Sequence, residues 1–128
     1  DRIEGFVELL AENGYKTGVI DCSYDADGAF DEYVAKNGMP SAIFCLSDMT
    51  AYGILNILKR HGETQTMVIG YDDISSDITM PVDVTSVGID KYEYVSYVIC
   101  KIIDKIEGRY NGRIAEKVSV RLHVGETA

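Results

Sequence analysis

The chain has 128 residues, 46% of them hydrophobic and 26% charged, which is typical of one soluble globular domain. Its 21 acidic and 12 basic residues leave a formal net charge of -9, so we expect no nucleic-acid-binding surface within these residues. No apolar run approaches the roughly 18 to 20 residues of a membrane span, and three widely spaced cysteines without a CxxC motif are typical of reduced thiols. These features predict a cytoplasmic protein without a membrane partner.

Helices and strands alternate along the chain. Apolar residues recur every three to four positions in the expected helices, and uninterrupted or alternating apolar runs mark the expected strands. In chain order, the expected elements are a helix at 2–13, a strand at 17–21, a helix at 25–37, a strand at 41–47, a helix at 48–61, strands at 66–71 and 82–87, a helix at 90–108 and a strand at 118–124. This order predicts an α/β fold with a mainly parallel sheet.

Two of the expected strands have contrasting patterns. Residues 41–47 are apolar without alternation, as expected for a central parallel strand covered on both faces. Residues 118–124 alternate apolar and polar side chains, which indicates an edge or half-exposed strand.

Cys45 and Cys100 fall on the expected core faces of their elements without a nearby histidine, so a cysteine nucleophile is poorly supported.

Polar side chains follow the expected strands at the edge where parallel strands end. In open parallel sheets, ligands bind at this edge because loops and helix N-termini converge there. The carboxylates and hydroxyls suit a neutral, hydroxyl-rich molecule or a divalent cation. The residues in question are those at 21–24, 47–48, 71–73 and 88–90.

Motifs for catalysis, cofactors and metals are missing from the sequence. It contains no glycine-rich dinucleotide or P-loop motif and no nucleophile elbow. His61 and His123 have no metal-ligand spacing to each other or to a cysteine. We therefore predict a protein that is not an enzyme and that has no catalytic residue, cofactor or metal site.

Some residues of the polar edge also have structural explanations. Ser47 or Asp48 can cap the following helix, and Asp90 can cap the long helix. The pair Asp72-Asp73 precedes no obvious helix, so we favour a binding role for Asp72. Arg2 lies at the end of a helix dipole that disfavours a cation, and this position alone suggests a solvated side chain.

Three motifs occur in a distinctive order. They are R-x-x-G-F at residues 2–6, P-x-A-[IF]-x-x-x-[SN]-D-x-x-A-x-G at residues 40–53, and V-x-G-[YF]-D-D at residues 68–73, followed by Val-Thr-Ser-Val at residues 84–87. In this combination the chain, from residue 2 to about residue 127, resembles the effector-binding region of the LacI/GalR family of bacterial transcriptional repressors.

The resemblance implies a three-layer α/β/α, Rossmann-like lobe of the periplasmic-binding-protein-like I type. In the family, two such lobes close on a sugar, a sugar phosphate or a purine, and closure controls DNA binding by a helix-turn-helix headpiece. Residues 1–89 correspond to the C-terminal lobe, and residues 90–124 to a helix and strand that return to the N-terminal lobe. The chain begins at Asp1 without a methionine, so we expect a piece whose operator-binding headpiece is absent.

Effector-binding residues carry over from the motifs. The resemblance implies that Arg2 and Asp72 bind effector hydroxyl groups, that Ser47 occupies a ligand position, and that Asp48 is nearer the fold than the ligand. The family often stacks an aromatic side chain on the sugar after the first strand of this lobe. This chain has Cys22 near that position, and Tyr24 is the candidate to substitute for the aromatic contact.

The resemblance also implies a homodimer. The family's dimer face uses the helix expected at 48–61 and the loop before the strand expected at 82–87, which here supply Tyr52, Leu55 and Met80. Near its end the family commonly has Arg-Glu-Ser, whereas this chain has Gly-Glu-Thr at residues 125–127.

Two alternatives from other classes remain open at this point. A receiver-like or Mg²⁺-dependent phosphotransfer domain would use Asp21, Asp48, Asp72 and Asp73 around the cation. A free-standing periplasmic sugar-binding protein would need an export signal and a second lobe.

Overall fold

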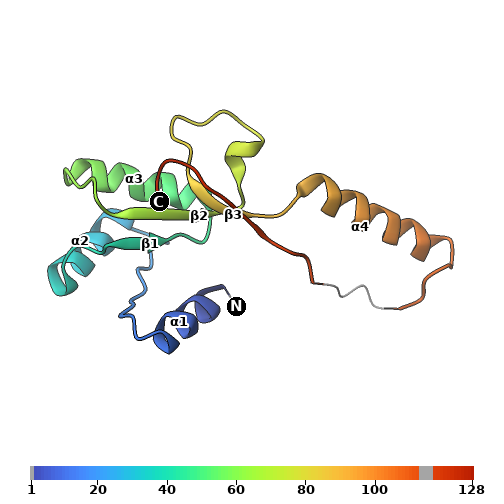
Figure 1. Cartoon of the computed structure of the whole chain (residues 1–128), viewed down its shortest axis with the longest axis horizontal. Helices are drawn as coiled ribbons and strands as arrows, with labels where there is room; N and C mark the ends of the chain where they lie inside the picture. The colour runs from blue at the N-terminus through green and yellow to red at the C-terminus, as the bar shows by residue number, and fades with distance from the viewer. Residues whose placement is uncertain (1, 113–116) are drawn as a thin grey trace.

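One mixed sheet organises the chain in the computed structural model, which describes residues 2–112 and 117–128 (Figure 1). Its strands lie in the order β1-β2-β3-β4, with β1 parallel to β2, β2 parallel to β3, and β4 antiparallel to β3. The strands are β1 (Ala42–Phe44), β2 (Met67–Tyr71), β3 (Thr85–Gly88) and β4 (Arg121–His123). The prediction of a mainly parallel sheet with an edge strand near the end of the chain is confirmed.

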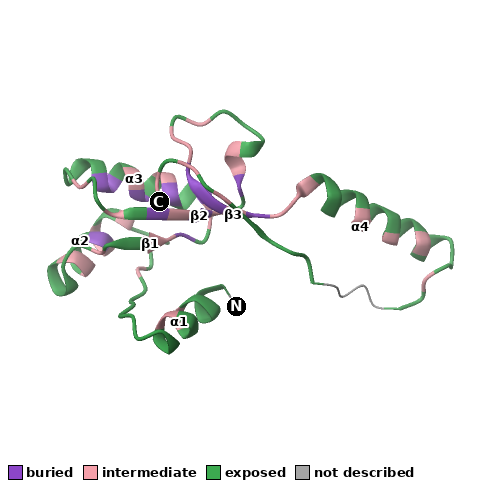
Figure 2. Ribbon diagram, viewed as in Figure 1, coloured by how far each residue is buried: buried purple, intermediate pink, exposed green. Residues whose placement is uncertain are grey.

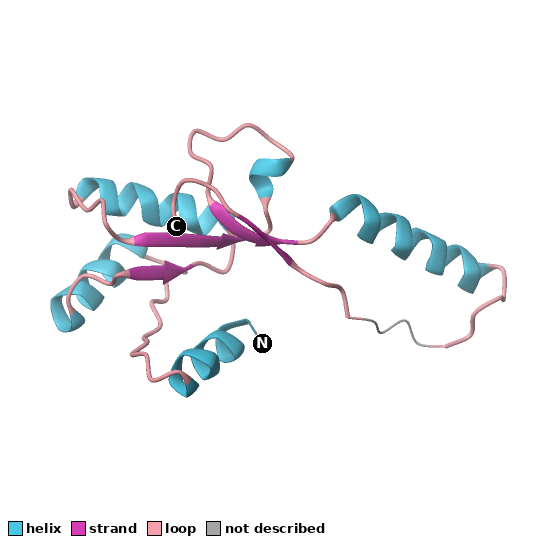
Figure 3. Ribbon diagram, in the orientation of Figure 1, coloured by secondary structure: helices cyan, strands magenta, loops and turns pink. Residues whose placement is uncertain are grey.

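The four helices form where the sequence predicts them (Figure 3). The helices are α1 (Arg2–Glu12), α2 (Ala26–Asn37), α3 (Asp48–Arg60) and α4 (Lys91–Ile106), with a short 3₁₀ helix, η1 (Ile74–Ser76), that the sequence did not predict. Figure 1 shows α3 above the sheet and α1 below it. On the lower side, the Phe6 ring of α1 stacks on the Phe44 ring of β1 with centroids 4.9 Å apart. None of the described helices combines the length and hydropathy of a membrane span.

The prediction of a strand at residues 17–21 is wrong. This segment is not assigned as a strand and pairs with none of the described strands, so β1 lies at an edge of the sheet instead of in its centre. Gly18 weakens the tendency of so short a run to form a strand, and a β-carbon on Gly18 would lie only 2.8 Å from the Tyr33 ring. The remaining strands are shorter than their apolar runs because the ladder ends where the pairing partner ends.

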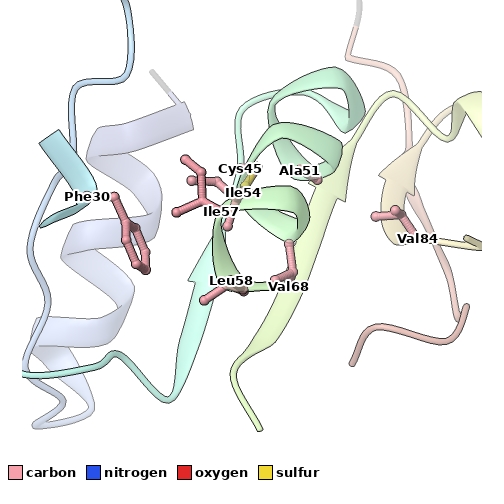
Figure 4. Close-up of a cluster of buried hydrophobic side chains, with 8 residues drawn as sticks. All are labelled: Phe30, Cys45, Ala51, Ile54, Ile57, Leu58, Val68 and Val84. Atoms are coloured by element: carbon pink, nitrogen blue, oxygen red, sulfur yellow. The ribbon is translucent and has the colours of Figure 1, made fainter. Parts of the chain in front are cut away.

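The hydrophobic core lies between the sheet, α3 and α2 (Figure 4). Leu58 and Ile57 of α3 are buried together with Val68 of β2, and Phe30 is the buried residue of α2. The complete buried cluster is Phe30, Cys45, Ala51, Ile54, Ile57, Leu58, Val68 and Val84. Removing such side chains from water contributes roughly 1.5 to 3 kcal/mol each to folding.

The C-terminal residues form hydrogen bonds with residues at the start of β2 and β3. Glu126 donates its backbone N–H to the Asp83 carbonyl (2.6 Å), and the Thr127 hydroxyl donates to the Val68 carbonyl (2.6 Å) and accepts from the backbone of Thr85 (3.0 Å). A β-carbon on Gly125 would lie 2.2 Å from the Asp83 carbonyl oxygen. This close approach leaves no room for a side chain at position 125 of this chain.

Helix α4 extends away from the rest of the fold (Figure 2). No described residue of α4 is buried, and Val95, Ile99 and Ile106 are half or more exposed. Cys100, expected on a core face, is exposed, since α4 makes few contacts with the other described elements. The apolar stripe of a 16-residue helix is therefore left open.

A buried carboxylate joins α3 to β3 and to the loop after β2. Asp48 Oδ1 accepts from the Ser86 hydroxyl (2.6 Å), and Asp48 Oδ2 accepts from the backbone N–H of Ile74 (2.7 Å). The Ser86 hydroxyl also accepts from the backbone N–H of Asp73 (3.0 Å). Asp48 is 1% exposed and does not cap α3, because the preceding residue, Ser47, does so.

We expect Asp48→Asn to lower the free energy of unfolding by about 2 kcal/mol, since the amide NH₂ must face one of two buried donors. Asp25→Asn is the matched control. Asp25 caps α2 by accepting from the backbone of Gly28 (2.9 Å), and asparagine caps helices as well as aspartate does. Urea unfolding of both variants measures the difference; equal stability of the two would contradict the assignment of Asp48.

Candidate functional site

The carboxyl ends of β1, β2 and β3 point to one side of the sheet, and the start of α1 lies on that side (Figure 1). This arrangement follows from the parallel pairing of the three strands. Each strand is followed by polar residues of the predicted edge. The residues that can meet a ligand here come from segments up to 70 positions apart in the sequence.

Arg2 is fixed against the ends of β1 and β2. Its guanidinium lies 3.7 Å from the centroid of the Tyr71 ring, and Nη1 donates to the Leu46 carbonyl at 3.0 Å. A cation over an aromatic ring is stabilised by about 0.5 to 2 kcal/mol. The expectation of a solvated side chain, drawn from the helix dipole alone, is therefore wrong: Arg2 is exposed but held in one place.

Asp72 and Asp73 form a left-handed corner at the end of β2. Their φ angles are 109° and 51°, values that non-glycine residues rarely adopt. Such conformations cost of order 1 to 3 kcal/mol each and persist only where surrounding contacts hold them. Here the Asp72 N–H donates to the Val87 carbonyl at 2.9 Å, and a β-carbon on Gly88 would lie 2.4 Å from Asp73 Cβ.

The two aspartates have different surroundings. The Asp72 residue is exposed, whereas Asp73 is buried and donates its backbone N–H to Ser86. The corner therefore presents one carboxylate to the ligand side and keeps the other inside. This separation agrees with the predicted binding role of Asp72.

Ser47 caps α3 at the end of β1. Its hydroxyl accepts from the backbone N–H of Thr50 (3.2 Å) and lies 2.9 Å from the Thr50 hydroxyl. One lone pair of the serine oxygen is thus used by the helix, and the hydroxyl retains further hydrogen-bonding capacity for a ligand. The role of Ser47 as a ligand residue stays a prediction.

Cys22 and Tyr24 lie in the turn before α2. Cys22 is half-buried and packs against the core cluster, while the Tyr24 residue is fully exposed. Asp21 holds this turn, because its Oδ1 accepts from both the backbone N–H (3.0 Å) and the hydroxyl (2.5 Å) of Ser23. These hydrogen bonds, the hydroxyl one foremost, lower the pKa of Asp21.

The predicted dimer residues share one side of the fold. The Tyr52 hydroxyl, on α3, donates to the Val82 carbonyl at 2.8 Å, which ties the helix to the loop before β3. Burial raises the pKa of Tyr52. Leu55 follows on the same helix and Met80 lies in the same loop; both are half-buried. The structure brings these three residues onto adjoining elements.

The acidic residues do not form a cation site in the described part of the chain, where no group of three or more His, Cys, Asp or Glu side chains could hold a metal ion. Asp48 and Asp73 are buried, and Asp21 binds its own turn through Ser23. The phosphotransfer alternative is therefore not favoured.

Sequence reasoning missed the partners of the site residues. Tyr71 was placed at a strand end without a role, yet its ring holds the Arg2 guanidinium. Ser86 was counted as part of an apolar strand, yet its hydroxyl joins Asp48 to the corner. The motifs contain both residues, but pairing across 38 to 69 positions leaves no periodic signal in one sequence.

Comparison with known proteins identifies the family. A model of the periplasmic binding protein-like domain matches residues 1–128. The chain belongs to this family. The HTH-type transcriptional repressor CytR of Escherichia coli K12 is 29% identical over 125 residues, which cover 87% of this chain and 35% of that repressor. Membership and this relative together confirm the resemblance to LacI/GalR-type regulators.

Solved structures share the fold. The transcriptional regulator CelR in complex with cellobiose matches with a TM-score of 0.81 and 23% identity, over 99% of this chain and 42% of that one. The lac repressor dimer bound to operator and the anti-inducer ONPF matches with a TM-score of 0.78 and 18% identity, over 98% and 40%. The chain thus spans about a third of the curated relative and under half of these regulators.

The thiols of this region should differ sharply in reactivity. Burial raises the pKa of Cys45 to about 12, with smaller contributions from Cys22 and Asp48. At about pH 8, roughly one Cys45 thiol in ten thousand is then ionised. Burial also raises the pKa of Cys22, which is only half-buried. We expect iodoacetamide to alkylate Cys22 slowly in the folded protein and Cys45 only after unfolding in urea. Peptide mass spectrometry measures the alkylation of each cysteine. Equal alkylation rates of Cys22 and Cys45 in the folded protein would contradict this prediction.

Proposed function

We propose that this chain is the effector-binding and dimerisation region of a LacI/GalR-type transcriptional regulator, and that it binds a sugar or a related metabolite without turnover. The observation that carries the proposal is the juxtaposition at the strand ends. The Arg2 guanidinium at the start of α1 is fixed over Tyr71, the last residue of β2, and the next residue, Asp72, presents an exposed carboxylate on the left-handed corner. The regulators CytR and CelR are relatives, and CelR was solved with cellobiose.

The chemistry of the two groups suits hydroxyl-rich ligands. A guanidinium fork and a carboxylate can each take two neighbouring hydroxyl groups, and charge-assisted hydrogen bonds of this kind contribute about 1.5 to 3 kcal/mol each. Their fixed positions reduce the entropy lost on binding. A sugar phosphate or a purine would use the same guanidinium, so the effector belongs to one of these three classes.

A second lobe would complete the pocket. We assign residues 1–89 to the C-terminal lobe and residues 90–124 to a helix and strand that return to the N-terminal lobe. The open apolar stripe of α4 supports this division, since an amphipathic helix is stable when its apolar face is covered. Effector binding between the lobes then shifts an equilibrium between open and closed states. Operator DNA would be bound by a headpiece outside this chain, in the cytoplasm.

Removal of either charged group should weaken binding. We expect Arg2→Ala and Asp72→Ala each to reduce affinity at least about tenfold, because each removes charge-assisted hydrogen bonds. Arg60→Ala is the control, since Arg60 pairs with Asp27 between α3 and α2. A thermal-shift panel of sugars, sugar phosphates and nucleobases on the full-length protein selects the ligand, and calorimetry then measures it. Unchanged affinity in both variants would refute the assigned site.

The isolated 128-residue chain offers a separate check. We expect it to bind the selected ligand at least about a hundredfold more weakly than the full-length protein, because half the contacts come from the other lobe. Calorimetry on both forms provides the comparison. Tight binding by the isolated chain would show that one lobe suffices.

The proposed homodimer face consists of Tyr52 and Leu55 on α3 and Met80 in the loop before β3. We expect Leu55→Glu to shift the full-length protein toward monomers, since it buries a charge in an apolar contact. Leu9→Glu on α1, on the other side of the sheet, changes the same residue type and is the control. Sedimentation velocity reads the oligomeric state, and a dimer unaffected by Leu55→Glu would place the interface elsewhere.

A further inference from the structure

His123 lies where three segments meet. It is the last residue of β4, and its Nε2 lies 2.9 Å from Asp83 Oδ1, in the segment that leads into β3. Its Nδ1 faces the left-handed corner after β2, 3.9 Å from Asp73 Oδ1. One imidazole thus stands between two carboxylates from different segments of the same loop region.

The carboxylate on the corner is unusual. The Asp73 side chain is 4% exposed, and its Oδ1 accepts no hydrogen bond within the described residues. A buried acceptor without a donor is costly, by about 1 to 3 kcal/mol. The His123 Nδ1 nitrogen faces this oxygen at 3.9 Å, so a small approach of the ring would let a proton on Nδ1 serve as its donor.

The two protonation states of the imidazole satisfy this site differently. A neutral imidazole has one N–H and can donate to one carboxylate, whereas an imidazolium has two and can donate to both. The hydrogen bond with His123 is the largest of the causes that lower the pKa of Asp83. Asp83 therefore stays ionised throughout the range in which histidines titrate.

The other charged groups near this cluster are already engaged. The Lys91 ammonium donates to the Asp73 carbonyl (2.9 Å) and pairs with Asp77, and Glu126 accepts from the Asp83 backbone (3.1 Å). On β4 itself, Arg121 lies 3.5 Å from Asp90. On the far side of Ser86 lies Asp48. His123 is the group whose ring nitrogen faces the unbonded Asp73 Oδ1.

The cluster adjoins the proposed dimer face. His123 and Asp83 form one wall of a hollow of about 310 Å³, and Met80 and Val82 line the same hollow. Val82 is also the residue whose carbonyl accepts from the Tyr52 hydroxyl. The loop held by His123 is therefore the loop that carries Met80.

We propose that His123 is a proton-operated latch that fastens the loop at residues 74–83 to β4. The protonated ring donates to both Asp73 and Asp83 and closes the latch, and the neutral ring releases the buried Asp73 carboxylate and loosens the loop. Because this loop carries Met80, the latch regulates the proposed dimer face, and in that respect the inference rests on the proposed function. Its effect on the loop itself does not.

Hydrogen–deuterium exchange of the full-length protein tests the latch. After correction for intrinsic exchange rates, we expect amides at residues 74–83 to be about three- to tenfold better protected at about pH 5.5 than at about pH 8, on either side of the ordinary imidazole range. His123→Gln and Asp83→Asn should each abolish this difference. Equal protection of the unmodified protein at both pH values, or a difference retained in both variants, would overturn the proposal.

The second histidine provides the matched control. His61 Nε2 lies 3.0 Å from Asp31 between α3 and α2, away from the loop, so His61→Gln should leave the pH dependence intact. An NMR titration of the His123 ring in the unmodified protein needs no variant, and amides at residues 74–83 should shift together with it. Independent titration of ring and loop would also overturn the latch. A protein that is monomeric but keeps the pH-dependent protection of residues 74–83 would refute the proposed dimer face and leave the latch supported.

Discussion

The hydrogen bonds of the buried Asp48 carboxylate are the contact on which the polar edge of the sheet depends. Asp48 stands at the start of α3 and binds the Ser86 hydroxyl in β3 and the Ile74 N–H after β2, so one side chain sets the relative positions of a helix, a strand and a loop. Gly70 makes room for it, since a β-carbon there would lie 2.0 Å from Asp48 Oδ1. Removal of either partner would leave buried polar groups unpaired, at a cost of about 1 to 3 kcal/mol each.

This contact explains how an energetically unfavourable backbone can be kept at the end of β2. The Ser86 hydroxyl accepts a hydrogen bond from the Asp73 N–H and donates one to Asp48. The Val87 carbonyl accepts a hydrogen bond from the Asp72 N–H, so hydrogen bonds hold both residues of the corner. The left-handed backbone places the Asp72 residue at the surface and the Asp73 side chain in the interior. A binding group that is positioned before the ligand arrives loses less entropy when it binds, and this is the use that the proposed effector site would make of the corner.

Much of the fold could be predicted from periodicity, because α3, α4 and the paired strands have strong apolar patterns. The strand expected at residues 17–21 failed, since its five residues include Gly18 and a strand is defined by a partner that sequence does not reveal. Site residues were predictable through motifs, but not their contacts: the Arg2 guanidinium on Tyr71 joins positions 69 apart. His123 gave no signal, because its two carboxylates lie 40 and 50 residues away.

The most direct test of the account is a crystal structure of the full-length protein with its tightest-binding sugar. We expect electron density for the sugar beyond the carboxyl ends of β1, β2 and β3, with hydroxyl groups within hydrogen-bond distance of both the Arg2 guanidinium and the Asp72 carboxylate, and with α4 covered by a second lobe. A sugar bound elsewhere, or one that contacts neither side chain, would contradict the central claim.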